Sequence, residues 1–494
     1  MNDRLIQYYR CPEQYVRFAL KETLPVTSGY FRFGQEATCY GSYRGQQASP
    51  FPAKTLHDAL RDVVIEDGTT YLPFNPSQIV DNLCREAYVA DWRHGPSSAL
   101  AGMYYFLRPA LSVGVRRRLQ RLHLRGWDKL SFPRWPVDCS VDNLSEQLML
   151  LSLRAAGVER IPFIWFWPEG SSSCAIMTHD IETKVGSDFC PTLMDIDDSF
   201  GIKASFQVIP EERYGVSPEF LQLIRQRGFE VVVHDLNHDG HLYRDREQFL
   251  ERAARINFYG KQYGAEGFRA GVLYRKQLWY GALRFSYDMS VPNVAHLDPQ
   301  RGGCCTVMPH FLGDILELPV TTVQDYTLFN ILNDYSISLW KQQIDIIMGK
   351  HGFMSFIVHP DYIMKPRELA VYKALLEHLA RLRQAKAVWI TTPGEVNRWW
   401  RQRAEMRLVE HAQGWQIEGS GKERARIAYA SEKEGHLVVT VQAPYRDKSH
   451  VGELSSAFGQ NGISRAGQNQ ALGCQSSASV PGSTKVVLNL FELA

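Results

Sequence analysis

Four short stretches of this 494-residue sequence combine residue types that can work together chemically. They lie at 178–182, 234–238, 267–271 and 355–361. In the first, Asp180 and Glu182 are two positions apart, so one carboxylate can ligate a metal while the other acts as a base. In the second, His234 and His238 have the i, i+4 spacing that brings two imidazoles to one side of a helical turn, which suits one divalent ion.

The other two stretches supply an arginine and a third histidine. Arg269 stands between two glycines, where its guanidinium can hold a carboxylate in a fixed orientation. His359 follows an apolar run and suits a general acid if burial and a neighbouring carboxylate bring its pKa near neutrality. Taken singly, each also has a structural reading: a surface Asp-x-Glu, a salt bridge, or a core histidine. With 15 histidines in the chain, an i, i+4 pair arises by chance about 0.5 times.

The elements that must position these residues follow from residue 162 onward, where short apolar runs alternate with segments of helical period. Strands are expected at 174–178, 203–208, 229–233, 267–269, 284–287, 315–320, 354–358 and 387–391. Helices are expected at 190–199, 217–227, 245–263, 275–283, 335–349, 366–384 and 393–403. This alternation predicts an α/β fold whose parallel sheet closes, or nearly closes, as a (β/α) barrel. All four stretches then fall at the carboxyl ends of strands, the rim where active sites of such barrels lie.

Composition and hydrophobic pattern divide the chain into four regions. Residues 1–170 predict a mostly helical N-terminal region of unassigned role, 171–404 the barrel, 405–445 a small β appendage and 446–494 a polar, low-complexity tail. Within the first region, five arginines are interleaved with apolar residues at 110–127, which indicates a basic amphipathic helix. It could dock on anionic lipid or an acidic partner, although a solvated face that covers the neighbouring domain is favoured.

Overall charge and cysteine usage bound the function further. The 55 Lys and Arg residues against 53 Asp and Glu give a formal net charge of +2, so no global field favours nucleic acid. The nine cysteines are odd in number and lack the paired spacing of a disulfide scaffold, which indicates mostly reduced thiols. No signal peptide or transmembrane segment is recognisable, so we expect a cytoplasmic protein, associated with the membrane surface if 110–127 binds lipid.

The four stretches, in this order and spacing, resemble the polysaccharide deacetylase family, the chitooligosaccharide-deacetylase-like enzymes of carbohydrate esterase family four. Asp180 stands at the first Asp of the family's Thr-Phe-Asp-Asp-Gly motif, and His234 and His238 match its His-x-x-x-His metal pair. Arg269 matches the Arg of its Arg-x-Pro motif, and His359 matches the His that closes its final motif. The stretch 285–290 also resembles the family's Gly-Phe-x-Tyr-Asp-Ser-Ser segment.

This resemblance covers about residues 172–403 and implies a distorted barrel of about seven strands with a divalent metal, usually zinc, on its rim. The first motif departs from the family pattern, because Ile181 replaces the second Asp, the metal ligand, and Glu182 replaces the following Gly. We therefore infer that Glu182, or Asp180 itself, completes the metal site with the two histidines. The resemblance further implies that Asp180 is the base, that Arg269 holds it, and that His359 protonates the leaving amine.

Three functions remain open at this stage. The favoured one is a metal-dependent deacetylase that removes N-acetyl groups from a sugar, an oligosaccharide or a glycolipid intermediate of glycan biosynthesis, acting on carbon–nitrogen bonds other than peptide bonds. The second is a hydrolase of a different linear or cyclic amide on the same metal site. The third, suggested by Ile181, is an inactive module that binds a glycan or a partner.

Several other features have structural interpretations. Cys304 and Cys305 are expected in a buried loop, and Trp399 and Trp400 are expected to cap the barrel rather than stack on a sugar. The acidic run 195–198 is expected to be a solvated helix end. Three further polar residues lie near the predicted rim and could line a groove: His310, Glu317 and Asp325.

Overall fold

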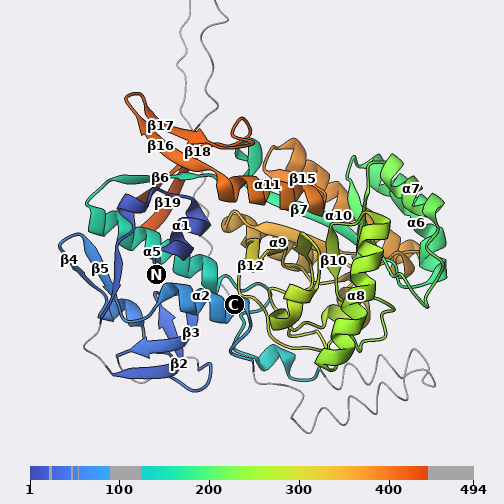
Figure 1. Ribbon diagram of the computed structural model, residues 1–494, viewed down its shortest axis with the longest axis horizontal. Coiled ribbons are helices and arrows are strands. Elements are labelled where there is room, and N and C mark those ends of the chain that lie inside the picture. The colour runs from blue at the N-terminus through green and yellow to red at the C-terminus, as the bar shows by residue number, and fades with distance from the viewer. Residues whose placement is uncertain (22–24, 46–47, 54, 90–123, 443–494) are drawn as a thin grey trace, which may run out of the picture. The chain divides into compact units, whose positions relative to one another are not determined.

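A curled sheet carries all four of the chemical stretches (Figure 1). The computed structural model describes residues 1–494 except 22–24, 46–47, 54, 90–123 and 443–494. The sheet runs in the order β12-β13-β11-β10-β9-β8-β7-β14, and β15 also pairs with β7. Its strands are β7 (Ser173–Asp180), β8 (Ala204–Val208), β9 (Glu230–His234), β10 (Gly267–Arg269), β11 (Tyr287–Asp288), β12 (His310–Leu312), β13 (Ile315–Glu317), β14 (Phe353–Ile357) and β15 (Val388–Thr391).

Every pairing in this sheet is parallel except that of β12 with β13, so the carboxyl ends of the parallel strands share one edge. The predicted (β/α) barrel is confirmed in its open form. In the described residues no strand pairing joins β14 to β13, and side chains close the gap instead. The hydroxyl of Thr321 donates to the Phe353 carbonyl at 2.9 Å, and that of Thr322 donates to the Ser355 carbonyl at 2.7 Å.

Helices follow most strands, as the sequence pattern predicts. They are α6 (Lys184–Ser199), α7 (Pro218–Gln226), α8 (Arg246–Tyr263), α9 (Ser338–Gly349), α10 (Pro366–Gln384) and α11 (Pro393–Glu405). Local chemistry explains where three of them begin, because the side chains of Thr183, Ser217 and Asp245 accept hydrogen bonds from first-turn backbone N–H groups of α6, α7 and α8. The predicted helix at 366–384 matches α10 at both ends, and Pro366 occupies its first turn.

The two faces of the sheet belong to different cores. Ala175 and Met177 of β7 pack in the cluster that includes the buried faces of α6 and α10, whereas Ile176 between them packs with residues of the N-terminal region. In β9, Val232 likewise packs with residues of the N-terminal region, whereas Val231 and Val233 pack in the cluster with α6 and α10. Strand residues alternate between faces, so this division shows that the N-terminal region completes the barrel's core.

The N-terminal region contains strands as well as helices, which corrects the prediction that it is mostly helical. Its described helices are α1 (Asp3–Tyr9), α2 (Pro76–Cys84) and α5 (Ser140–Ala156). Its strands are β1 (Phe18–Leu20), β2 (Val26–Phe33), β3 (Ala37–Arg44), β4 (Val64–Glu66), β5 (Thr69–Leu72) and β6 (Arg160–Ile164). The long β2–β3 hairpin contains Gly, Ser and Arg among its aromatic residues, so its hydrophobic alternation is too weak to mark it as a pair of strands.

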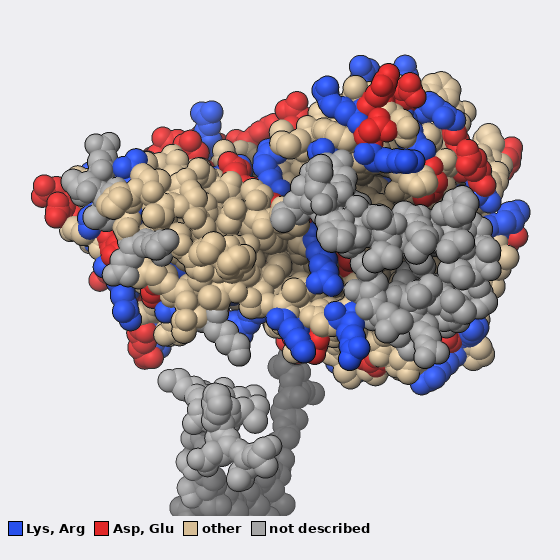
Figure 2. All heavy atoms as spheres, turned by 90° about the horizontal axis from the view of Figure 1, so that it is seen from below, with Lys and Arg blue, Asp and Glu red and all other residues tan. Residues whose placement is uncertain are grey.

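The strands expected after residue 405 are present as β16 (Arg407–His411), β17 (Gly414–Glu418), β18 (Ile427–Lys433) and β19 (His436–Val441). β18 pairs antiparallel with β6, with Ala428 opposite Phe163, so this sheet is shared with the N-terminal region. Residues 446–494 and most of the basic segment 110–127 lie outside the described residues. None of the described helices is long and apolar enough to cross a membrane. On the face seen in Figure 2, charged residues of both signs lie mostly around the edges of a broad area of other residues.

Candidate functional site

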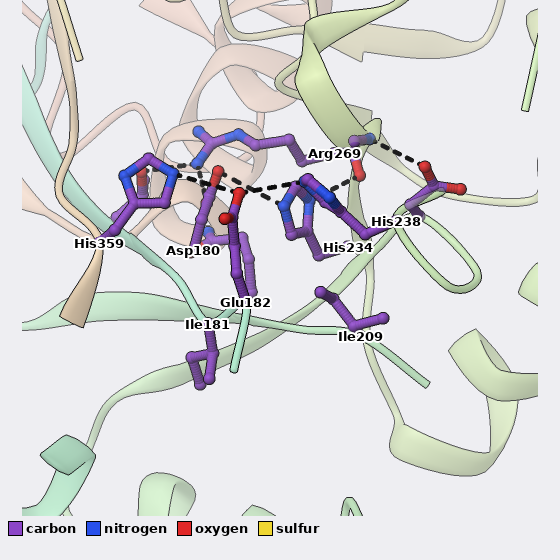
Figure 3. A network of polar contacts seen from close by, with 12 residues as sticks. Asp180, Ile181, Glu182, Ile209, His234, His238, Arg269 and His359 are labelled. Carbon is purple, nitrogen blue, oxygen red and sulfur yellow. Dashed lines mark hydrogen bonds and ion pairs between the residues drawn. The ribbon is translucent and has the colours of Figure 1, made fainter. Parts of the chain in front are cut away.

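The barrel rim brings the four sequence stretches together (Figure 3). Asp180 is the last residue of β7 and Glu182 follows two positions later, while His234 ends β9 and Arg269 ends β10. Arg269 lies opposite His234 in the parallel pairing of β10 with β9. His359 comes two residues after the end of β14, which pairs with the other edge of β7. The prediction that these side chains share one edge of the sheet is confirmed.

A buried ion pair joins Asp180 to Arg269. Nη1 of Arg269 lies 2.6 Å from Oδ1 of Asp180 and donates a second hydrogen bond to the Thr178 hydroxyl at 2.8 Å. Nε of the same guanidinium donates to the Met289 carbonyl at 3.0 Å, which fixes its orientation. Burial opposes the charge on Asp180, but the attraction of Arg269 and then His234 outweighs it and lowers the pKa of this carboxyl. Asp180 is therefore an ionised carboxylate held in one place.

Three further groups form a compact donor set that could hold a metal ion. One ligand atom each from Glu182, His234 and His238 lie within 4.8 Å of one another. Oε1 of Glu182 is 3.2 Å from Nε2 of His238. Two imidazole nitrogens and a carboxylate are a typical set of protein ligands for zinc in a catalytic site, with the fourth position left to water or substrate.

His234 shows most clearly that a ligand fits here. Its Nδ1 lies 3.2 Å from the Arg269 carbonyl oxygen, which can only accept, so Nδ1 carries the hydrogen and Nε2 has a free lone pair. That Nε2 atom is buried and has no hydrogen-bond partner among the described residues. Burial lowers the pKa of His234 to about 4, so the ring is neutral at pH 7. A neutral imidazole with an unused, buried lone pair is what a metal site requires.

The geometry favours Glu182 over Asp180 as the carboxylate of the donor set. Oδ2 of Asp180 is 3.7 Å from Nε2 of His234, but its other oxygen is engaged by Arg269. Ile181 explains how Glu182 reaches the site. Its side chain is fully buried in the hydrophobic core and points away from the two histidines in Figure 3. Its N–H donates to the Gln207 carbonyl and its own carbonyl accepts from the Tyr214 hydroxyl, which fixes the turn before Glu182.

The loop after β9 brings the second histidine into place, and here the expected helical turn is wrong. Residues 235–240 form no helix, and both Asp235 and His238 have left-handed backbone conformations, with φ of 58° and 54°. The buried carboxylate of Asp235 accepts hydrogen bonds from the N–H groups of Leu236, at 2.7 Å, and Gly271, at 3.2 Å. Asp235 thus ties the histidine loop to the segment that follows Arg269.

The donor set is electrostatically coupled. Burial raises the pKa of Glu182, but the neighbouring His238 and then His359 outweigh burial and hold it well below its usual range. Burial likewise lowers the pKa of His238, yet Glu182 and then Asp235 raise it above its usual value. Each of these two groups therefore favours the charged form of the other.

His359 lies on the other side of Glu182 from the two ligand histidines (Figure 3). Its Nε2 is 3.7 Å from Oε1 of Glu182, and its Nδ1 is 2.7 Å from Oδ1 of Asp325. The other oxygen of Asp325 accepts the His359 backbone N–H at 2.8 Å. Burial opposes the imidazolium, but Asp325, Glu182 and Asp180 outweigh it and raise the pKa of His359 to about 10. His359 is thus protonated at neutral pH.

Asp325 is the functional partner that the sequence prediction treated only as a possible groove residue. It is fully buried and lies 34 positions before His359 in the chain, so no local pattern joins the two. Glu317, the second groove candidate, is also fully buried, and it accepts the Val291 N–H through Oε1. His310 is partly buried at the start of the antiparallel β12.

Asp197 of the acidic run, the described cysteines and the tryptophan pair lie in the interior, which corrects the prediction for Asp197 and confirms the others. Asp197, in the acidic run expected to be solvated, is fully buried because it is hydrogen-bonded to His179 and Tyr372. The eight described cysteines, Cys304 and Cys305 among them, are buried and unpaired. Trp399 is buried and its indole N–H donates to the Phe166 carbonyl at 2.8 Å, so it packs rather than presents a sugar platform.

Comparisons with known proteins give matches among solved structures. Polysaccharide deacetylases are among the structures that this chain is similar to. A putative polysaccharide deacetylase from Mycobacterium smegmatis is 18% identical over 48% of this chain and 93% of that chain, with a TM-score of 0.40. A probable polysaccharide deacetylase from Pseudomonas aeruginosa PAO1 is 12% identical over 47% and 92%, and Puue allantoinase is 13% identical over 47% and 92%, both with a TM-score of 0.37. No family model and no curated protein matches the chain.

Proposed function

We propose that this protein is a metal-dependent hydrolase that removes N-acetyl groups from a sugar, an oligosaccharide or a glycolipid intermediate. The observation that carries the proposal is the free, buried lone pair on Nε2 of His234, which faces the same space as His238 and Glu182. An ionised carboxylate and a protonated imidazole flank that space, as metal-assisted amide hydrolysis requires.

His234, His238 and Glu182 would hold the ion, and zinc is the best match to two imidazoles and one carboxylate. When bound, a divalent cation supplies a Lewis acid that polarises the amide carbonyl and acidifies water. Asp180 accepts the proton of the attacking water, because Arg269 keeps this carboxylate ionised and fixed beside the donor set. Arg269 holds Oδ1 of Asp180 and leaves Oδ2, 3.7 Å from Nε2 of His234, as the oxygen that would accept the proton beside the donor set.

His359 donates the second proton. Its imidazolium is present at neutral pH, and the leaving nitrogen of a cleaved amide needs a proton to depart as an amine. Asp325 holds Nδ1, so Nε2 is the atom left to face the substrate. The choice of an N-acetyl sugar over another amide rests on the order and spacing of the four stretches that resemble polysaccharide deacetylases.

The test is acetate release from a panel of N-acetylated sugars and glycans. Metal-stripped protein is assayed with and without added Zn²⁺, beside His234→Ala, which removes the lone pair. Acetate release that needs the metal and is lost in the variant supports the proposal. Tight metal binding with no acetate from any substrate points to a different linear or cyclic amide, and absence of metal binding would leave only a binding module.

A further inference from the structure

A fully buried polar cluster lies on the face of β7 opposite to the catalytic groups. Thr178 and Asp180 both contact Arg269, and His179 between them points the other way, toward α6 and α10. There Nε2 of His179 is 2.9 Å from Oδ2 of Asp197, and the hydroxyl of Tyr372 donates to the other oxygen of that carboxylate. Relative exposure is 0% for all three members of the cluster.

The cluster reaches the catalytic side through one backbone group. Nδ1 of His179 lies 3.0 Å from the carbonyl oxygen of Val358, and because a carbonyl oxygen only accepts, Nδ1 is the donor. The N–H of the same peptide group belongs to His359, and it donates to Oδ2 of Asp325 at 2.8 Å. The Val358–His359 peptide is therefore held at both ends by buried side chains, His179 at its oxygen and Asp325 at its nitrogen.

This peptide determines where the imidazole of His359 lies. The C=O and N–H of a peptide point in opposite directions, so losing either hydrogen bond allows the plane to rotate and carries the His359 Cα with it. A displacement of about 1 Å at a catalytic group can cost about 100-fold in rate. The side chain of His179 forms no hydrogen bond or ion pair with the donor set, and its hydrogen-bonded route to His359 runs through Val358.

We propose that His179 is a positioning residue, which orients His359 against Glu182 and Asp180 by holding the Val358 carbonyl. This inference rests on the proposed function, since it assigns His359 the role of proton donor. Nε2 of His179 in turn lies 2.9 Å from Asp197 and 3.4 Å from the Tyr372 hydroxyl. If His179 were only structural, loss of any of its hydrogen bonds would lower the free energy of unfolding without a specific effect on kcat.

Two substitutions separate the two contacts of His179. The amide nitrogen of Asn occupies nearly the place of ring Nδ1, and that of Gln nearly the place of Nε2. His179→Asn therefore keeps a donor for Val358 and gives up Asp197, whereas His179→Gln keeps the Asp197 contact and gives up Val358. We expect kcat to fall about 10- to 100-fold in His179→Gln and by no more than about threefold in His179→Asn, with little change in KM or in zinc affinity in either.

Amide hydrogen exchange provides a readout that does not need activity. We expect the peptide covering 356–363 to exchange faster in His179→Gln than in His179→Asn or in the natural protein. If the natural protein releases no acetate but this difference is present, the proposed function fails, while the finding that His179 holds the Val358–His359 peptide in place stands. Equal exchange and equal kcat in the two variants would overturn the positioning role.

Tyr372→Phe is the matched control, because it removes contacts to Asp197 and to Nε2 of His179 but keeps the His179 donor to Val358. It should lower the melting temperature and reduce kcat and the protection of 356–363 no more than His179→Asn does, and a loss of kcat like that of His179→Gln would contradict the proposal. Should His179→Gln fail to fold, His179→Phe combined with Asp197→Leu replaces both partners by apolar groups. The same loss of kcat is then expected, and full activity of this double variant would overturn the inference.

Discussion

Oε1 of Glu182 lies 3.2 Å from Nε2 of His238. Asp180, at the end of β7, is instead paired with Arg269 and has its other oxygen 3.7 Å from Nε2 of His234. The hydrogen bond between Asp180 and Arg269 gives the two carboxylates different neighbours. Acidic groups with such different surroundings typically take different chemical roles. The pair therefore allows ligand and base to be distinguished by experiment.

The first prediction concerns that distinction. Glu182→Gln removes the charged ligand. Loss of an outer-shell partner already lowers metal affinity by about 10- to 100-fold, so the loss of a ligand should lower zinc affinity by at least as much. Asp180→Asn is the matched control, and it should abolish turnover while zinc affinity changes little. Isothermal titration calorimetry with Zn²⁺ measures the zinc affinity of both variants. If Asp180→Asn weakens zinc as much as Glu182→Gln does, the two carboxylates share the ligand role.

The second prediction is that zinc binding depends on pH near neutrality. Glu182 raises the pKa of His238 in the metal-free protein, so a proton must leave this ring before it can ligate. Zinc affinity should therefore rise with pH until His238 has lost its proton, and binding below the pKa of His238 should release a proton. Titrations in buffers of different ionisation enthalpy count that proton. Binding that releases no proton across this range would show that His238 is not a ligand.

The central strands and their end residues could be predicted from the sequence because their signals are local. β9 contains the short β-branched run Val231–Val233, and His234 follows from where that run ends, while Arg269 ends the short segment that alternates with the predicted helices on either side. The helix at 366–384 was equally accessible, since one apolar stripe and an initial proline define it. Elements whose burial is set within a few residues are those that a single sequence specifies best.

The features that the sequence could not provide depend on distant partners. Asp197 lies in an acidic run that looks solvated, and only His179 on β7 and Tyr372 on α10 make its burial favourable. The position of Glu182 beside His238 depends on the turn at Ile181, which the Gln207 carbonyl and the Tyr214 hydroxyl fix from elsewhere. The loop at 235–240 has a helical spacing of histidines, but two left-handed residues prevent a helix there.

The third prediction concerns the role of Asp325. Asp325→Asn removes the carboxylate that does most to stabilise the imidazolium of His359, so the pKa of His359 should fall below its present value of about 10. If His359 is the acid, the alkaline limb of the kcat profile should move to lower pH in this variant, because the proton is lost earlier. Replacement of the acid itself, in His359→Asn, should reduce kcat by about 100- to 10,000-fold. An unchanged alkaline limb in Asp325→Asn would assign the proton donation to another group.

The fourth prediction is that the Asp180–Arg269 pair stabilises the fold above acidic pH. The pKa of Asp180 is lowered in the folded protein, so this stabilisation is fully present above the unfolded value of about 4 and is lost as the pH falls toward the folded value. Arg269→Met leaves a buried carboxylate without its partner and should cost about 3–5 kcal/mol at pH 7. Urea unfolding between pH 3 and 7 should show a smaller loss of stability on acidification in the variant. An identical pH dependence in both proteins would refute the assignment.

The fifth prediction concerns the closure of the barrel between β14 and the segment after β13. The Thr321 hydroxyl donates to the Phe353 carbonyl and accepts the Ser355 N–H at 2.9 Å, in place of the strand pairing that a closed barrel would have. Thr321→Val keeps the shape but leaves two buried backbone groups without a partner, so the free energy of unfolding should fall by about 1–3 kcal/mol. Thr440→Val, on the exposed face of β19, is the matched control and should change stability by no more than about 0.5 kcal/mol. If the two variants unfold at the same urea concentration, the prediction is wrong, and water then satisfies the Phe353 carbonyl and the Ser355 N–H in place of the hydroxyl.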